Sequence, residues 1–121
     1  MNGVVALRPF VPARDFELAK RFYRRLGFEP GLETPDIAIF AAGAFSFILQ
    51  NFYEKALAEN FMVQLTVDRL GDWWAALEPE ALATDFGVRP PRAPARQPWG
   101  LEVAYLFDPS GVLWHVAQAP A

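Results

Sequence analysis

His115 is the only histidine in the chain, and imidazole is the side chain that most readily gains or loses a proton near neutral pH. It lies in the apolar segment 112–117, which follows the turn sequence Asp108-Pro109-Ser110-Gly111. Alternation along a strand would place His115 with Leu113 on one face and Trp114 on the other. Two interpretations remain open: a titratable donor or acceptor in a site, or a buried histidine that donates to a backbone carbonyl.

Other side chains exclude several kinds of chemistry. The chain has no cysteine, so disulfides, thiolate metal sites and cysteine nucleophiles are excluded. The acids of the first half stand at a helix start or in loops, so no pair for acid–base catalysis is evident: Glu17, Glu29, Glu33 and Asp36. A net charge of −3 gives no support for nucleic-acid binding.

Length and composition indicate one globular domain over residues 1–121, with 53% hydrophobic residues available for a core. No apolar run reaches the roughly 18 residues of a membrane span, so we expect no membrane contact. The first residues lack a basic segment followed by a long apolar one. A cytoplasmic protein is therefore expected.

The first half reads as one strand, one helix and three strands. The apolar run 4–11 predicts a strand, although Pro9 favours an edge or a break. Asp15 is the expected N-cap of a helix that ends at Gly27. Short strands are predicted around Phe28, over 37–41 and over 45–50, and residues 51–60 read as a linker with one or two helical turns.

The second half repeats this order. A strand is predicted over 61–67 and a helix from Leu70 that reaches Leu82 despite Pro79. A short strand at 86–88, an exposed proline-rich loop at 89–98 and strands at 101–107 and 112–116 complete it. The helical patterns repeat at an offset of about 54 residues. We therefore predict an α+β fold of two βαβββ modules, about 1–52 and 60–121, with curved, mainly antiparallel sheets, helices outside and a cleft within.

Two segments, VPARDFELAKRFYRRLGF (11–28) and WGLEVAYLFDPSGVLWHVA (99–117), resemble the signature regions of the glyoxalase/bleomycin-resistance/extradiol-dioxygenase superfamily, also called vicinal oxygen chelate proteins. The resemblance covers nearly the whole chain and implies paired βαβββ modules around a cleft. The start of the chain, with Pro9 and no histidine, is more similar to bleomycin-resistance-type binding proteins than to the metalloenzymes.

Metal-using members of that superfamily carry ligands at four points, which the resemblance places at Arg8, Gln50, Met62 and His115. Arginine cannot ligate a divalent cation and methionine is a poor ligand for hard or borderline metals. Two remaining donors do not hold a catalytic metal that needs three. We therefore expect no metal and no other cofactor.

If these positions keep the family's pocket-facing directions, polar and apolar side chains would line a site for an aromatic or anionic small molecule: Arg8, Phe47, Gln50, Trp99, Tyr105, Leu113 and His115. Trp114 fits better under a helix, and Arg8 could instead pair with Glu102. Three functions remain open: a metal-free sequestering protein, a glyoxalase-like lyase or isomerase using His115 as base with Arg8, and a structural dimer module without a ligand.

Two expectations concern the surface. Unpaired strand edges and a surplus of aromatic residues, Phe52 and Tyr53 among them, predict a homodimer. The basic side chains of the proline-rich loop are expected to border the cleft entrance and attract an anion: Arg89, Arg92 and Arg96.

Overall fold

The first helix, α1 (Phe16–Leu26), begins and ends where its capping residues predict. The Asp15 carboxylate accepts a hydrogen bond from the Leu18 backbone N–H at 3.1 Å, which satisfies one of the free amides of the first turn. Gly27 ends the helix with φ at 108°, a left-handed conformation that favours glycine. The apolar stripe of α1 is thereby directed at the sheets, and both Phe22 and Tyr23 are fully buried.

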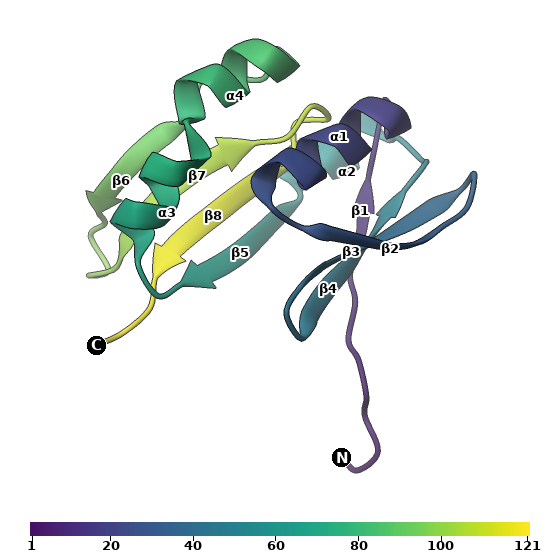
Figure 1. Cartoon of the computed structure of the whole chain (residues 1–121), viewed down its shortest axis with the longest axis horizontal. Coiled ribbons are helices and arrows are strands. Elements are labelled where there is room, and N and C mark those ends of the chain that lie inside the picture. Colours follow the sequence, from purple (N-terminus) through teal and green to yellow (C-terminus); the bar gives the residue numbers. More distant parts are fainter.

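The computed structural model describes residues 1–121 (Figure 1). Its first sheet contains four strands. In spatial order the strands are β1 (Phe10–Pro12), β4 (Phe45–Gln50), β3 (Ile37–Ala42) and β2 (Glu29–Glu33). β1 runs parallel to β4, and the other neighbours are antiparallel. The sheet therefore has the strand–helix–strand–strand–strand order predicted for the first module.

The strand predicted over 4–11 is wrong for most of its length, because β1 covers only Phe10–Pro12. Pro9 still offers its carbonyl to the Ile48 N–H at 2.9 Å, but a proline has no N–H to continue the ladder. The preceding residues leave the sheet (Figure 1), and Val5 and Leu7 are 99% and 89% exposed. The strand placed around Phe28 begins one residue later, at Glu29.

The second sheet follows α2 (Lys55–Asn60), a short helix in the predicted linker. Its strands in spatial order are β5 (Met62–Val67), β8 (Leu113–Gln118), β7 (Glu102–Phe107) and β6 (Arg92–Arg96). β5 and β8 are parallel, and β6, β7 and β8 are antiparallel neighbours. The helical segment between β5 and β6 consists of α3 (Leu70–Leu77) and α4 (Pro79–Phe86).

Three expectations for the second half need correction. The predicted helix is broken at Glu78, whose φ is 54°, because Pro79 cannot continue α3 and instead opens α4. The strand predicted at 86–88 is the end of α4 and its Gly87 cap. The loop predicted at 89–98 contains β6, because an edge strand tolerates proline where it needs no N–H partner.

The two sheets share one apolar core, and α1 lies across both modules (Figure 1). Phe22 of α1 packs edge-on against Phe86 of α4 with ring centroids 5.4 Å apart, and Tyr23 lies 5.5 Å from Trp114 of β8. The predicted α+β architecture of two βαβββ modules is confirmed, with the helix of the second module split in two. None of the helices has the length and apolar character that crossing a membrane requires.

Candidate functional site: a cavity between the modules

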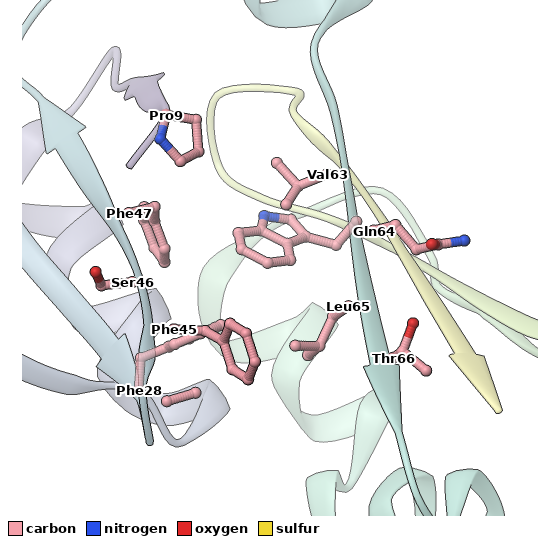
Figure 2. Close-up of a pocket in the computed structure, with 11 residues that line it drawn as sticks. Pro9, Phe28, Phe45, Ser46, Phe47, Val63, Gln64, Leu65 and Thr66 are labelled. Carbon is pink, nitrogen blue, oxygen red and sulfur yellow. The ribbon is translucent and has the colours of Figure 1, made fainter. Parts of the chain in front are cut away.

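A partly open cavity of about 360 Å³ lies between the two modules. Its lining is mainly apolar and comes from both sheets: Pro9, Phe28, Ala42, Phe45, Ser46, Phe47, Val63, Gln64, Leu65, Thr66 and Trp114. Figure 2 shows Phe47 on one side of the cavity and Val63 and Leu65 on the other, carried by strands of the two sheets. Cavities of this size and composition suit the apolar part of a small ligand.

Strand alternation and register explain this lining. The parallel register of β5 on β8 sets Val63 beside Trp114, and Leu65 shares their face because side chains alternate along a strand. The Gln64 side chain points away from the cavity (Figure 2). The interior therefore presents aromatic and aliphatic surface with few polar groups.

A buried hydrogen-bond network stands behind the aromatic wall. The Trp114 indole Nε1 donates to the Tyr23 hydroxyl at 2.9 Å, and this hydroxyl donates to Asp108 Oδ2 at 2.5 Å. The other carboxylate oxygen of Asp108 accepts from the backbone N–H groups of Ser110 and Val112, at 2.8 and 2.9 Å. The network joins α1 of the first module to the turn that leads into β8.

The electrostatics of this network follow from burial. Asp108 is only 2% exposed, and the loss of hydration raises the pKa of its carboxyl from 3.8 to about 6, against the opposing effect of its hydrogen bonds. Burial also raises the pKa of Tyr23 well above its usual range, and the nearby carboxylate adds to this shift. Tyr23 therefore remains a neutral hydrogen-bond donor.

A second polar cluster surrounds His115 on the opposite face of β8. The Gln64 amide nitrogen lies 3.2 Å from His115 Nδ1, within hydrogen-bonding distance. The Trp99 ring stacks over the imidazole with centroids 6.1 Å apart, and Tyr105 meets it edge-on at 5.3 Å. The expected partner, a backbone carbonyl, is thus replaced by a side-chain amide, and His115 is 9% exposed.

The seven residues expected to bind a ligand do not lie together in the structure. Only Phe47 lines the cavity. Trp99, Tyr105 and Leu113 lie with His115 on the face of the second sheet opposite Trp114, as the pairing of β7 with β8 requires.

Arg8 precedes β1, and Gln50 is the last residue of β4 in the first sheet. Arg8 Nε donates to Ser46 Oγ at 2.8 Å, and Ser46 and Gln50 share the face of β4 opposite Phe47. The alternative pairing of Arg8 with Glu102 is wrong, because the ion pairs of the chain involve only Lys20 and Arg24 as cations.

The three arginines expected at a cleft entrance are exposed; Arg89 precedes β6, and Arg92 and Arg96 are its first and last residues. Arg89 places its guanidinium 4.1 Å from the ring centroid of Phe107, a cation–π contact. Arg92 pairs with Tyr105 across the strands, and so lies on the His115 face. Arg96 pairs with Glu102 on the other face of the sheet.

The four positions that correspond to metal ligands do not fit a metal. Gln50 lies on the first sheet, Arg8 is hydrogen-bonded to Ser46 of that sheet, and Met62 and His115 lie on the second. No three histidine, cysteine, aspartate or glutamate side chains come together anywhere in the chain to hold an ion. The donor set therefore offers at most one amide and one imidazole, which are on different sheets.

Sequence reasoning missed most of the cavity. Phe28, Phe45, Val63 and Leu65 line it, yet each reads in the sequence as an ordinary strand or core residue. The sequence does contain one signal, the apolar residues Val63 and Leu65 at alternate positions of β5. This pattern identifies a cavity only when the register of β5 on β8 is known. Gln64 was missed as the partner of His115 for the same reason.

Comparisons with known proteins agree with this architecture. Residues 5–116 match the family model described as the Glyoxalase/Bleomycin resistance protein/Dioxygenase superfamily. A bleomycin resistance protein from Klebsiella pneumoniae is 31% identical over 114 residues, which cover 91% of this chain and 89% of that protein.

Two solved structures are similar along almost the whole chain. A bleomycin-binding protein in complex with bleomycin has a TM-score of 0.76 at 25% identity, covering 97% of this chain and 100% of the other. The bleomycin-binding protein of Streptomyces verticillus, complexed with copper(II)-bleomycin, has a TM-score of 0.71 at 19% identity, covering 99% and 100%. The chain belongs to the glyoxalase/bleomycin resistance protein/dioxygenase superfamily.

Proposed function

We propose that this protein binds and sequesters a small amphiphilic molecule, with an aromatic part of the ligand in the cavity between the modules and without a metal in the protein. The observation that carries the proposal is the cavity itself, about 360 Å³ of space lined by seven hydrophobic residues. An apolar ring that displaces poorly ordered water from such a surface gains affinity.

A permanent positive charge stands behind one wall of the cavity and favours a ligand with a hydrogen-bonding or anionic end. Ser46 contributes to the lining, but its hydroxyl lies on the face of β4 opposite Phe47, where it accepts a hydrogen bond from the guanidinium of Arg8. The similarity to a bleomycin resistance protein makes bleomycin-type antibiotics the first compounds to test.

The geometry gives less support to a lyase or isomerase. Such an enzyme would need His115 as base and Arg8 as electrostatic partner on one substrate. In this chain Arg8 is bonded to β4 of the first sheet, and His115 is covered by Trp99 on the second. A structural module without a ligand would in turn have no need of the open cavity.

Thermal unfolding with and without bleomycin tests the proposal. A ligand at about 100 times its Kd stabilises the native state by about 2.7 kcal/mol, which raises the melting temperature of a domain of this size by roughly 10 °C. The measurement is repeated with EDTA and metal-free bleomycin. No shift and no heat of binding with bleomycin or with a panel of aromatic anions would contradict the proposal.

A matched pair of variants on β5 locates the site. Leu65→Trp fills the cavity and should abolish the thermal shift, because Leu65 faces Trp114. Met62→Trp is the control on the same strand, since Met62 is 61% exposed and points to the other face. If only Met62→Trp lost binding, the binding site would instead lie on the face of the second sheet that carries His115.

We propose further that two copies of the chain form a homodimer. The supporting observation is exposed apolar surface at the start of the chain, where Val5 and Leu7 have almost no contacts within one copy. Phe52, 48% exposed, adds to this surface. Sedimentation should show a dimer at micromolar concentration that dissociates in the double variant Val5→Asp, Leu7→Asp; a wild-type monomer of 13.6 kDa would contradict it.

A further inference from the structure

The two sequence motifs that carry the family resemblance are joined by side-chain hydrogen bonds inside the core. Tyr23 comes from the first motif and Asp108 from the second, 85 residues later, and their side chains are joined inside the core. Neither residue lines the cavity. Both are buried, at 0% and 2% exposure.

Tyr23 is the residue on which the aromatic wall rests. Its ring contacts three aromatic residues that line the cavity: Phe47 at 4.9 Å, Trp114 at 5.5 Å and Phe28 at 6.1 Å between centroids. Its hydroxyl also accepts the hydrogen bond of the Trp114 indole. Tyr23 therefore determines both how the aromatic residues of the wall pack and how the Trp114 indole is rotated.

Asp108 in turn holds the Tyr23 hydroxyl in place. The carboxylate is fixed by the N–H groups of Ser110 and Val112, within the turn that leads to Trp114 itself. No buried side-chain polar atom in the chain lacks a hydrogen-bond partner. Rotation of the indole out of its position would leave its N–H and the Tyr23 hydroxyl without these bonds, which is costly in a core.

We infer that Tyr23 and Asp108 are positioning residues that hold the Trp114 indole against the cavity and thereby determine its affinity for planar aromatic ligands. The inference rests on the proposed binding function. Because the indole N–H is engaged by Tyr23, the ring presents its apolar surface and not a donor to the ligand. The cavity is thus matched to a neutral planar ring, and ring-bearing ligands should be preferred to aliphatic ones of equal size.

Tyr23→Phe tests this inference, because it keeps the ring packing and removes only the hydroxyl. The probe is N-phenyl-1-naphthylamine, a neutral dye that fluoresces in apolar surroundings. We expect its Kd to rise about tenfold, the equivalent of one lost hydrogen bond to a buried group. The Trp114 indole N–H signal in nuclear magnetic resonance, identified by its absence in Trp114→Phe, should shift and exchange faster with solvent in Tyr23→Phe.

Two controls separate positioning from general destabilisation. Leu82→Ala removes an equally buried side chain of α4 that lines no cavity, and should lower the melting temperature without changing the Kd more than about twofold. In a Trp114→Phe background, Tyr23→Phe should have almost no further effect on the Kd, because the hydrogen bond it removes is already absent.

The outcomes distinguish this inference from the proposed function. If wild-type protein binds neither the dye nor bleomycin, the proposed function fails, and the indole signal alone decides whether Tyr23 holds Trp114. If wild type and Tyr23→Phe bind the dye equally, or the indole signal is unchanged in Tyr23→Phe, the inference is overturned while the binding function stands.

Discussion

Asp108 should make the stability of this fold depend on pH in the direction opposite to that of a salt-bridged carboxylate. Its carboxyl is almost completely buried, and its pKa is raised from 3.8 to about 6 chiefly by the loss of hydration. A pKa that is higher in the folded than in the unfolded state means that the folded state binds the proton more tightly. The resulting stabilisation is fully present below the unfolded-state pKa and is lost as pH rises through about 6.

The size of the effect follows from the shift. A difference of about 2.2 pH units, at 1.36 kcal/mol per unit, corresponds to about 3 kcal/mol in full. Most of this should be lost between pH 4 and pH 7. Glu33 acts in the opposite direction, because its hydrogen bond with Lys20 lowers its pKa and its contribution is lost as pH falls.

A comparison with Asp108→Asn isolates the buried carboxyl from such other groups. Asparagine keeps an oxygen for the N–H groups of Ser110 and Val112 but does not titrate. Urea unfolding followed by tryptophan fluorescence at pH 4, 5, 6 and 7 gives the unfolding free energy of both proteins. The wild-type value minus the variant value should fall by about 2 kcal/mol over this range.

The reasoning is refuted if that difference is constant or rises with pH. A rise would mean that the three hydrogen bonds to the carboxylate outweigh its dehydration, so that the folded-state pKa lies below 3.8. Glu102→Gln, at an exposed position at the start of β7, is the control for replacing a carboxyl by an amide at the surface.

Three other predictions concern capping, metal and charge. Asp15→Ala should lower the unfolding free energy by about 1 kcal/mol in urea, because the N–H of Leu18 loses its acceptor; an unchanged midpoint would contradict the cap. Purified protein should carry no stoichiometric zinc, nickel, iron or manganese, and EDTA should leave the melting temperature unchanged; a metal at one per chain would overturn the metal-free proposal. Glutamine should replace three basic side chains together: Arg89, Arg92 and Arg96. Association with an anionic ligand should then become slower and lose its dependence on salt concentration, and an unaltered rate in stopped-flow measurements would count against electrostatic steering.

Local rules in the sequence were sufficient for α1 and for most of the order of elements. Asp15 and Gly27 delimit α1 because a cap and a left-handed terminus depend only on a few neighbouring residues. Period-two and helical periodicity located seven of the eight strands approximately, and α1 and α3 start 54 residues apart, at Phe16 and Leu70. The resemblance carried by the two motifs then led to the correct superfamily.

Pairing partners decided the elements where the sequence-based prediction was wrong. β6 has the composition of a loop, yet it is a strand because β7 offers it an unpaired edge. Most of the segment 4–11 has the composition of a strand, yet it stays outside the sheet because Pro9 interrupts the ladder to β4. Local propensity is a weak guide when a partner strand or its absence determines the hydrogen bonds.

The candidate site depends on tertiary structure most of all. From the sequence, the single histidine and the aromatic residues could be named, but not the side of the sheet on which a cavity opens. The parallel register of β5 on β8 sets Val63 beside Trp114, and the docking of α1 brings Tyr23 to Asp108. Contacts between segments this distant arise from packing of the whole core, so residue types and spacing alone could not reveal them.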